Sequence, residues 1–383
     1  MSEWKEFKFS DFVIINPSVK LPSKEQVSFV EMKDLVDGKR FCYPSSTRIN
    51  GSGAKFQNYD TLFARITPCL ENGKICQVKG LKNGCGLGST EFLVFRGKVN
   101  TSDTDFVYYL SRWDDVRSHA EINLDGTSGR QRVPKECFND LILKLPKNIQ
   151  EQTAIASVLN SLDDKIDLLH RQNATLEKMA ETLFRQWFIE EAKEEWETKS
   201  LSKMAHFLNG LACQKFPPKN EVDKLPVLKI KELSSGINEN SDWGTKDVNP
   251  DYIVKNGDII FAWSASLMVK IWNGQDCILN QHLFKVTSKD YPKWFYYYWC
   301  KHHLAEFISI ATSHATTMGH IKRSDLDEAI VLIPGKLELD SMTQQIEPFF
   351  KKIITNNTQI RTLTSLRDTL LPKLMSGEVR VEY

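Results

Sequence analysis

The sequence repeats itself, because segments of its first half recur in the second half in the same order. EWKEFKFSD near the start is matched by EWETKSLSK, which pairs Trp4 with Trp196. NYDTLFARI is then matched by NGDIIFAWS, GSTEFLVF by LNQHLFKV, and DFVYYL by KWFYYYW. Each half closes with a polar stretch, a strand pattern and a proline, followed by a long helical pattern. Since internal repeats indicate that one structural unit is used more than once, we expect two modules, each followed by a helix.

Both modules carry mixed secondary-structure signals. Short runs such as TLFARI, EFLVFRG and DIIFAWS alternate with Gly, Asn and Pro clusters, as strands do. DFVYYLSRWDDVRSHAEI and PKWFYYYWCKHHLAEFISIA instead place aromatic residues at helical spacing. We therefore expect an α+β fold with four parts: a first module over 1–149, a central helix over 150–192, a second module over 193–340 and a C-terminal helix over 341–383.

The central helix has the apolar seam of a coiled coil. Its apolar residues recur at steps of four and three, at Ile155, Leu159, Leu162, Ile166, Leu169, Leu176, Ala180, Leu183 and Trp187. The C-terminal helix has matching steps at Ile346, Phe349, Ile353, Ile360, Leu363, Leu370 and Leu374. We expect the two helices to pair antiparallel as an intramolecular coiled coil, giving a pseudo-twofold molecule. A coiled coil that only joins two domains, or that forms a homodimer, fits the same periodicity.

Polar residues interrupt both seams. Asn173 lies in the central seam, and Asn356 and Arg367 lie in the C-terminal one. A seam Asn lowers stability but fixes register and partner, because it is left without a hydrogen-bond partner when the helices slip. An Asn at the wet edge of a loosely packed helix is the alternative, and the sequence favours neither.

Overall composition limits the classes of function. The chain has 383 residues with 50 Lys and Arg against 49 Asp and Glu, so any nucleic-acid binding must use local patches. The 8 cysteines form no CxxC pair, which favours reduced, packed thiols over a metal site. MSEWKEFKFS has no apolar leader, and no run reaches the about 18 apolar residues of a membrane span, so we expect a cytoplasmic protein.

The helices also carry a family resemblance. LHRQNATLEKMAETLFRQWF resembles the central conserved helix of specificity subunits of type I restriction-modification enzymes, and LRDTLLPKLMSGEV resembles their C-terminal conserved helix. FARITPCLENGK and FAWSASLMVKIWNG, with the strands that follow them, look like the target-recognition domains of that family. Pro372 departs from an ideal helix, and we expect it to kink the last helix.

The resemblance implies a non-catalytic subunit. Its two target-recognition domains would each read one half of a bipartite, asymmetric double-stranded DNA site. Its helices would dock two methyltransferase subunits, which would bind S-adenosylmethionine and methylate adenine, and restriction subunits would complete the complex. This chain would bind no cofactor and no metal. The helix residues that match the docking segments are Leu176, Met179, Leu183, Phe184, Trp187, Phe188, Leu366, Leu370, Leu371 and Leu374.

The absence of catalytic motifs agrees with this interpretation. No GxxxxGK[ST] phosphate loop and no Asn/Asp-Pro-Pro-aromatic motif occurs, and the spaced glycines of GCGLGS precede a predicted strand instead of following one. Two other functions stay open beside it. One is a tandem-domain coiled-coil scaffold that binds only protein, and the other, less favoured, is an enzyme that acts on DNA by itself.

Base-reading surfaces need donors and acceptors that match base edges, with cations and hydroxyls for phosphates. Clusters of these residues occur at equivalent places in both modules. They are Arg65, Asn72, Lys74, Thr127, Ser128, Arg130, Gln131 and Arg132 in the first, and Lys270, Asn280, Gln281, His282, Thr316, Thr317, His320, Lys322 and Arg323 in the second. Each could instead belong to a solvated loop, or at Asn280 and Ser89 to a turn that bonds its own backbone. Trp263, Trp272 and the FYYYW run favour core packing over base stacking.

Overall fold

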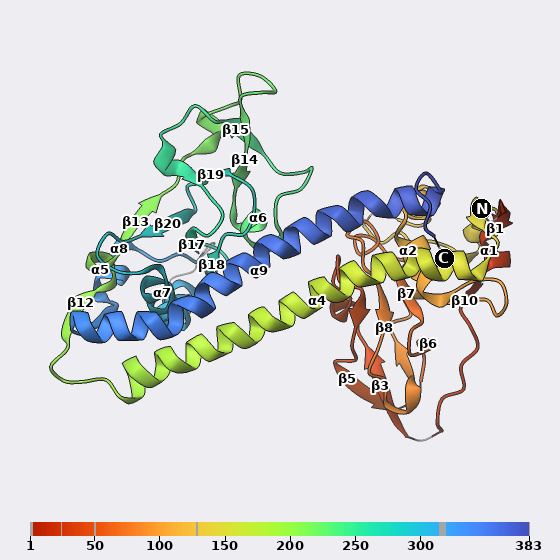
Figure 1. The fold of residues 1–383 in the computed structure, drawn as a ribbon, viewed down its shortest axis with the longest axis horizontal. Helices are drawn as coiled ribbons and strands as arrows, with labels where there is room; N and C mark the ends of the chain where they lie inside the picture. Colours follow the sequence, from red (N-terminus) through yellow and green to blue (C-terminus); the bar gives the residue numbers. More distant parts are fainter. Residues whose placement is uncertain (1–2, 24, 50, 128, 314–318, 383) are drawn as a thin grey trace. The chain divides into compact units, whose positions relative to one another are not determined.

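A computed structural model describes residues 3–23, 25–49, 51–127, 129–313 and 319–382. The chain divides into two compact units (Figure 1). Unit 1 comprises Met1–Leu168 and Thr362–Tyr383, and unit 2 comprises Leu169–Arg361. Each unit is therefore built around one module, with one segment of each long helix.

Unit 1 contains eleven strands in three sheets and three short α-helices in its described residues. The sheet orders are β1-β11, β2-β10-β7-β8-β4 and β5-β3-β9-β6. The strands are β1 (Trp4–Lys8), β2 (Val13–Ile15), β3 (Gln26–Val30), β4 (Phe41–Cys42), β5 (Ser46–Ile49), β6 (Ala54–Gln57), β7 (Thr61–Ala64), β8 (Ile75–Val78), β9 (Cys85–Gly88), β10 (Phe92–Gly97) and β11 (Ile142–Pro146). The short helices are α1 (Phe9–Phe12), α2 (Thr104–Arg112) and α3 (Asp114–Ile122), after which α4 (Ile149–Arg185) begins.

Unit 2 repeats this plan with ten strands among its described residues. The sheet orders are β12-β21, β13-β20-β17-β18 and β15-β14-β19-β16. The strands are β12 (Glu197–Ser200), β13 (His206–Asn209), β14 (Lys224–Leu228), β15 (Trp243–Thr245), β16 (Ile253–Val254), β17 (Ile259–Ala262), β18 (Met268–Ile271), β19 (Cys277–Leu279), β20 (Leu283–Thr287) and β21 (Ile330–Ile333). The helices are α5 (Leu201–Met204), α6 (Ile230–Ser235), α7 (Lys293–Ser313), α8 (Arg323–Glu328) and the start of α9 (Lys336–Ser376).

The central strand of each main sheet is covered on both faces. All four residues of β7 and all four of β17 are buried. Because successive side chains of a strand point to opposite faces, Phe63 joins one hydrophobic cluster and Leu62 another. Phe261 and Ile260 divide in the same way in unit 2. This two-sided burial explains why the strands read as continuous apolar runs.

Equivalent hydrogen bonds confirm the predicted duplication. The indole Nε1 of Trp4 donates to Glu151 in the first turn of α4, and that of Trp196 donates to Glu338 in the first turn of α9. The two main sheets share one strand order, to which unit 1 adds β4. The pairs β3·β9 and β14·β19 are both parallel. The α+β tandem fold expected from the sequence is therefore confirmed.

The two long helices pack against each other antiparallel within each unit. In unit 1, Ile155 and Leu159 of α4 share a core with Leu371 and Leu374 of α9. In unit 2, Phe184 shares a core with Ile346 and Phe350, among other residues. Helix α9 continues through Pro372, and α4 ends at Arg185 in a π-helical turn over Gln186–Glu190. The 162–188 segment is thus helical throughout, but its last turn is wider than an α-helix.

The polar seam residues are paired; Asn356 and Arg367 are buried, and Asn173 is half-buried. Within unit 2, Asn356 is fully buried and its Nδ2 donates to Asn173 Oδ1 at 2.9 Å, while Asn173 Nδ2 donates to Asn357 at 2.7 Å. Of the two interpretations of Asn173, this contact supports the one in which the Asn fixes helix register.

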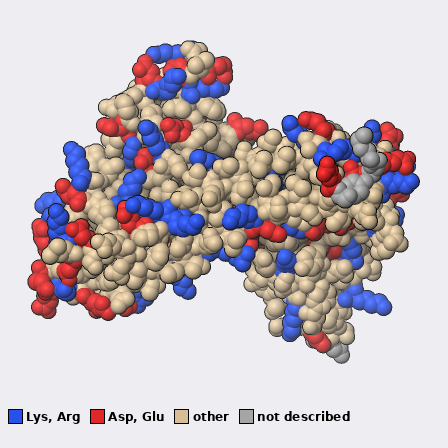
Figure 2. Space-filling model, viewed as in Figure 1, with Lys and Arg blue, Asp and Glu red and all other residues tan. Residues whose placement is uncertain are grey.

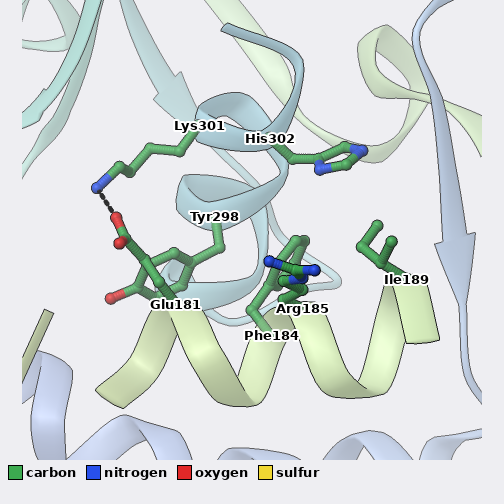
Figure 3. A pocket seen from close by; sticks show the side chains of 7 residues that line it. All are labelled: Glu181, Phe184, Arg185, Ile189, Tyr298, Lys301 and His302. Carbon is green, nitrogen blue, oxygen red and sulfur yellow. Dashed lines mark hydrogen bonds and ion pairs between the residues drawn. The ribbon is translucent and has the colours of Figure 1, made fainter. Parts of the chain in front are cut away.

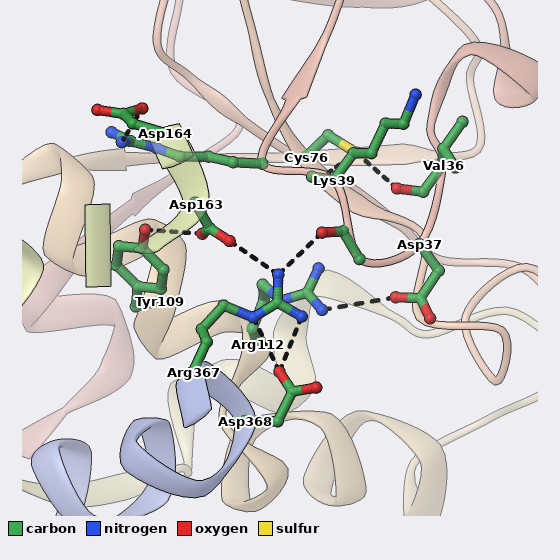
Figure 4. Close-up of polar contacts among 12 residues, drawn as sticks. Val36, Asp37, Lys39, Cys76, Tyr109, Arg112, Asp163, Asp164, Arg367 and Asp368 are labelled. Carbon is green, nitrogen blue, oxygen red and sulfur yellow. Dashed lines mark hydrogen bonds and ion pairs between the residues drawn. The ribbon is translucent and has the colours of Figure 1, made fainter. Parts of the chain in front are cut away.

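Arg367 forms the corresponding polar contact of unit 1. Its Nη1 lies 2.8 Å from Asp163 Oδ1 and donates to the Gly38 carbonyl at 2.9 Å (Figure 4). Tyr109 Oη donates to the other oxygen of Asp163 at 2.8 Å. Asp163, which no apolar pattern marks, is therefore the buried partner that makes a seam arginine possible.

All 8 cysteines are free, and Cys42, Cys76, Cys213, Cys277 and Cys300 are buried, which confirms packed thiols. No helix in the described part of the chain combines the length and apolar character that a membrane span requires.

Candidate nucleic-acid interface

Three segments of unit 1 meet beside the end of β7. The Arg65 backbone N–H donates to the Glu91 carbonyl at 3.0 Å, and the Val133 N–H donates to the Arg65 carbonyl at 2.8 Å. An isolated antiparallel bridge joins Ile66 to Arg132. We name the resulting group, Arg65, Glu91 and Arg132, the unit 1 corner. Its backbone bonds hold together side chains that lie far apart in the sequence.

The unit 1 corner carries a forked ion pair. Arg132 donates from Nε and Nη2 to Glu91, with distances of 2.9 and 2.8 Å to its two carboxylate oxygens. The hydrogen bond with Glu91 raises the pKa of Arg132, so the guanidinium stays charged. Both side chains remain accessible, because Arg132 is 45% exposed and Glu91 23% exposed. The pair therefore presents an oriented cation at the surface.

A hollow of about 410 Å³ opens next to this pair. It is lined by Arg65, Asp125, Gly126, Thr127, Arg130, Arg132 and Pro134. The Nε of Arg65 is buried and has no hydrogen-bond partner among the described residues. A buried donor without a partner is rare in folded proteins, and the residue that carries it is one of those that line the hollow.

The remaining candidates of unit 1 surround the corner or support it. Asn72 and Thr127 are exposed, whereas Gln131 is half-buried and its backbone N–H donates to Thr67 Oγ1. Lys74 donates from Nζ to the Met32 carbonyl at 2.9 Å, so its ammonium group already has an internal partner. Ser128 lies outside the described residues.

Unit 2 builds an equivalent corner from different side chains. The Trp263 N–H donates to the His282 carbonyl at 3.4 Å, the Ile321 N–H donates to the Trp263 carbonyl at 3.1 Å, and a bridge joins Ser264 to His320. We name Trp263, His282 and His320 the unit 2 corner. The indole centroid lies 6.0 and 6.2 Å from the two imidazoles. The same backbone frame thus holds an aromatic group where unit 1 holds charges.

Trp263 packs against the core of unit 2, as expected, but it is only partly buried there. Its ring is half-buried and stacks on Phe284 at 5.6 Å, while Nε1 donates to Asn209 at 3.2 Å. Trp272 and the FYYYW run are buried, as expected. Its burial is only partial because Trp263 follows β17, where the chain leaves the covered part of the sheet.

Two candidates of unit 2 prove to be structural. Asn280 is buried and its Oδ1 accepts from the His282 N–H at 3.3 Å, as Ser89 Oγ accepts from the Glu91 N–H at 3.2 Å. Both residues form turns that bond their own backbone, so Asn280 is not available to DNA. Lys270 Nζ donates to the Leu233 and Ser234 carbonyls at the end of α6, and burial lowers its pKa. We therefore remove Asn280 and Lys270 from the candidate interface.

The other candidates of unit 2 lie near its corner. Gln281 is half-buried, and its Nε2 lies 3.4 Å from His282 Nε2. Lys322 and Arg323 are exposed at the start of α8. Thr316 and Thr317 lie outside the described residues.

Glu91 is not among the candidates predicted from the sequence, and no sequence pattern connects the three positions of either corner. Glu91 and His282 occupy the same place in GSTEFLVF and LNQHLFKV. That equivalence was the signal that could have identified Glu91.

Some helix residues assigned to partner docking prove to be core residues. Phe184 and Phe188 belong to the core of unit 2, and Leu371 and Leu374 belong to the core of unit 1. These four are corrected, because the seam pattern marks apolar positions without saying what packs on them. Met179 and Leu366 are exposed, and Leu176, Leu183, Trp187 and Leu370 are half-buried.

Two hollows of unit 2 adjoin these helix residues. One of about 380 Å³ lies between α4 and α7, where the Glu181–Lys301 ion pair and His302 surround Phe184 (Figure 3). Another of about 740 Å³ is lined by Met179, Leu183 and Phe349 together with Ala174, Thr175, Lys178 and Thr182 of α4. Only some of the apolar residues of α4 and α9 are therefore accessible to a partner protein.

Charges of both signs are interspersed on the face seen in Figure 2. This agrees with the net charge of +1. Electrostatic attraction to DNA must therefore come from local groups such as the unit 1 corner. Among the described residues no group of His, Cys, Asp and Glu is arranged to hold a metal ion.

Comparison with known proteins agrees with the duplication of the chain. A family profile described as type I restriction modification DNA specificity domain matches residues 1–178 and again 193–365. The type I restriction enzyme MjaIX specificity subunit of Methanocaldococcus jannaschii is 28% identical over 307 residues, covering 73% of this chain and 70% of that protein. The HindI specificity subunit of Haemophilus influenzae is 20% identical over 99% of this chain and 100% of its own.

A solved structure shows the same fold. The crystal structure of the type I restriction-modification system S subunit from M. genitalium aligns with a TM-score of 0.55 at 13% identity, covering 98% of this chain and 96% of that chain. The two profile matches together span most of the sequence, one in each half. The chain belongs to the family of the type I restriction modification DNA specificity domain, and it carries that domain twice.

Proposed function

We propose that this chain is the non-catalytic DNA specificity subunit of a type I restriction-modification system. Each unit reads one half of a bipartite, asymmetric site in double-stranded DNA. The observation that carries the proposal is the pair of corners, because one backbone frame presents Arg65, Glu91 and Arg132 in unit 1 but Trp263, His282 and His320 in unit 2. Different side chains on equivalent frames recognise different base sequences.

The chemistry of the system belongs to partner subunits. We propose that two methyltransferase subunits, which bind S-adenosylmethionine, dock on the accessible residues of α4 and α9, and that restriction subunits join them. Met179 and Leu366 are the most exposed of the docking candidates. This chain itself would then need no cofactor, and it would act in the cytoplasm, where its DNA target lies.

The adenine methylation pattern of the host tests the proposal. Deleting the gene should abolish methylation at one split DNA motif, as read by single-molecule sequencing, and restoring the gene should return it. If every methylated motif persists after deletion, the proposal is wrong.

A binding measurement distinguishes DNA recognition from a purely structural role. Affinity of the full complex for a duplex that carries the motif should fall steeply as salt rises, because cationic side chains displace counterions from phosphates. An affinity that does not change with salt concentration would instead indicate a scaffold that binds protein through apolar surfaces.

A further inference from the structure

We propose that the unit 1 corner reads a G·C base pair in the half-site of unit 1, and that the unit 2 corner imposes no such requirement on the other half-site. This inference rests on the proposed function and adds the identity of one base pair and of the side chains that select it. It follows from which hydrogen-bonding groups remain free at each corner.

The hydrogen bonds of Arg132 leave one edge of its guanidinium available. Glu91 accepts from Nε and Nη2, and the Arg130 carbonyl accepts from Nη1 at 3.3 Å. A guanidinium has five N–H donors, so one on each terminal nitrogen remains. In the proposed contact these two donors form the fork that pairs with O6 and N7 of guanine. An A·T pair offers no equivalent pair of neighbouring acceptors on its purine.

Glu91 acts as a positioning residue with a second role at the base pair. Its carboxylate fixes the plane of the Arg132 guanidinium through hydrogen bonds to Nε and Nη2. A carboxylate has more acceptor sites than these bonds use, and cytosine presents its N4 amino group as a donor in the major groove. The donors of Arg132 and the acceptor oxygens of Glu91 thus lie side by side, as recognition of the guanine and the cytosine of one base pair requires.

Arg65 supplies a cation beside this pair. Its Nε is buried without a partner among the described residues, and it lines the same hollow as Arg130 and Thr127. A cation and a hydroxyl beside a base-reading fork are the groups that hold a phosphate and set the register of the duplex.

The unit 2 corner lacks both the fork and the carboxylate. Its indole Nε1 already donates to Asn209, and His282 Nδ1 lies 3.1 Å from Ser264 Oγ. Each imidazole has two ring nitrogens that point in diverging directions, so they cannot form a fork toward one base edge. The equivalent position of the second half-site is therefore not selected as G·C by this mechanism.

The test maps adenine methylation in host strains that carry Arg132→Lys or Glu91→Gln in the full-length chain. Arg48→Lys is the matched control, because Arg48 pairs with Glu31 at 3.5 Å in the same unit and is similarly exposed. His320→Ala tests the other corner. Binding of each complex is then measured on the wild-type motif duplex and on duplexes in which each G·C pair is replaced by A·T.

Arg132→Lys and Glu91→Gln should each relax one G·C position in one half-site, with about 5- to 150-fold loss of discrimination there and no change in the other half. His320→Ala should alter only the other half, and Arg48→Lys should alter neither. The inference is overturned if the corner variants keep the wild-type preference, if the relaxed position is A·T, or if Arg48→Lys gives the same relaxation. Persistence of the motif after gene deletion overturns the proposed function and the inference together, so the two failures are distinguishable.

Discussion

Arg367 is the buried charge on which the packing of α9 in unit 1 depends. Its side chain is 3% exposed and that of Asp163 is 2% exposed (Figure 4). Burial lowers the pKa of Arg367, but Asp163 and Asp368 more than offset this, and the net shift is upward. The guanidinium therefore remains charged inside the protein and needs its carboxylate partner.

Asp163→Ala should destabilise unit 1 by about 3–5 kcal/mol, because it leaves the Arg367 charge buried without its main partner. Hydrogen exchange measures this unit by unit, and protection should fall in residues 3–168 but not in 169–361. Lys351→Ala, at an exposed pair with Glu347, is the control and should change protection little. Equal loss in both units would contradict the assignment.

Asp105 should make unit 1 sensitive to acid. Burial raises the pKa of its carboxyl. Arg40 at 2.8 Å and the hydrogen-bond donors Gln77 and Asn160 lower that pKa by more than burial raises it, so the net shift is downward. A depressed carboxyl pKa contributes stability that is present above the unfolded pKa of about 3.9 and is lost as pH falls through the folded pKa.

Asp105→Asn should therefore lower the urea midpoint of the chain at pH 7, with a difference from wild type that shrinks below about pH 4. Urea unfolding at several pH values, followed by fluorescence, checks this. A gap that is constant with pH would show that the carboxylate charge is not what stabilises this site.

The contact between α4 and α9 in unit 2 depends on the Asn173–Asn356 pair. Asn356→Ala should cost about 1–3 kcal/mol, because it removes a buried hydrogen-bond partner. Replacing both residues by Leu should recover the stability, since apolar seams are more stable, but should loosen helix register. Double-mutant analysis by denaturant unfolding measures the first effect, and spin-label distances between α4 and α9 within unit 2 measure the second. A double variant with unchanged spacing would contradict a role in register.

The long helices and the duplication were predictable because their signals are local or repeated. Seam residues such as Ile155 and Leu159 are visible as a spacing, and the Trp4 and Trp196 segments as a match. The partner of a polar seam residue was not predictable, because Asp163 contacts Arg367 only when the chain has folded and brought α9 back beside α4. Phe184 shows the same limit, since its apolar character did not reveal whether the chain itself covers it.

The candidate interface was predictable only in part, for a similar reason. Arg65, Arg132, His282 and His320 have the right chemistry and were found singly. Bridges between distant segments, such as that from Ile66 to Arg132, assemble the corners, and no spacing in the sequence encodes such a bridge. Local turn chemistry explains the failures, because Asn280 serves the backbone beside it.

Unit 1 draws on both ends of the chain, which constrains any exchange of specificity. Arg380 lies 4.4 Å from the centre of the Trp4 ring, and its Nη1 lies 2.9 Å from Glu151 Oε1. Met375 and Leu374 near the end of α9 fill the same core as Phe9 and Phe12. The boundary of the unit is therefore not a single point in the sequence.

A chimera that takes residues 1–168 and 362–383 together from a relative should exchange one half of the methylated motif and keep the other. A chimera that takes residues 1–168 alone should exchange the same half of the motif but be less stable. Its equivalents of Trp4 and Glu151 would contact residues 362–383 of this chain, with which they did not evolve. Methylation mapping measures the first effect and hydrogen exchange in unit 1 measures the second. If the two-segment chimera changes both halves, or neither, the units do not read DNA independently. If both chimeras are equally stable, the C-terminal segment contributes nothing specific to unit 1.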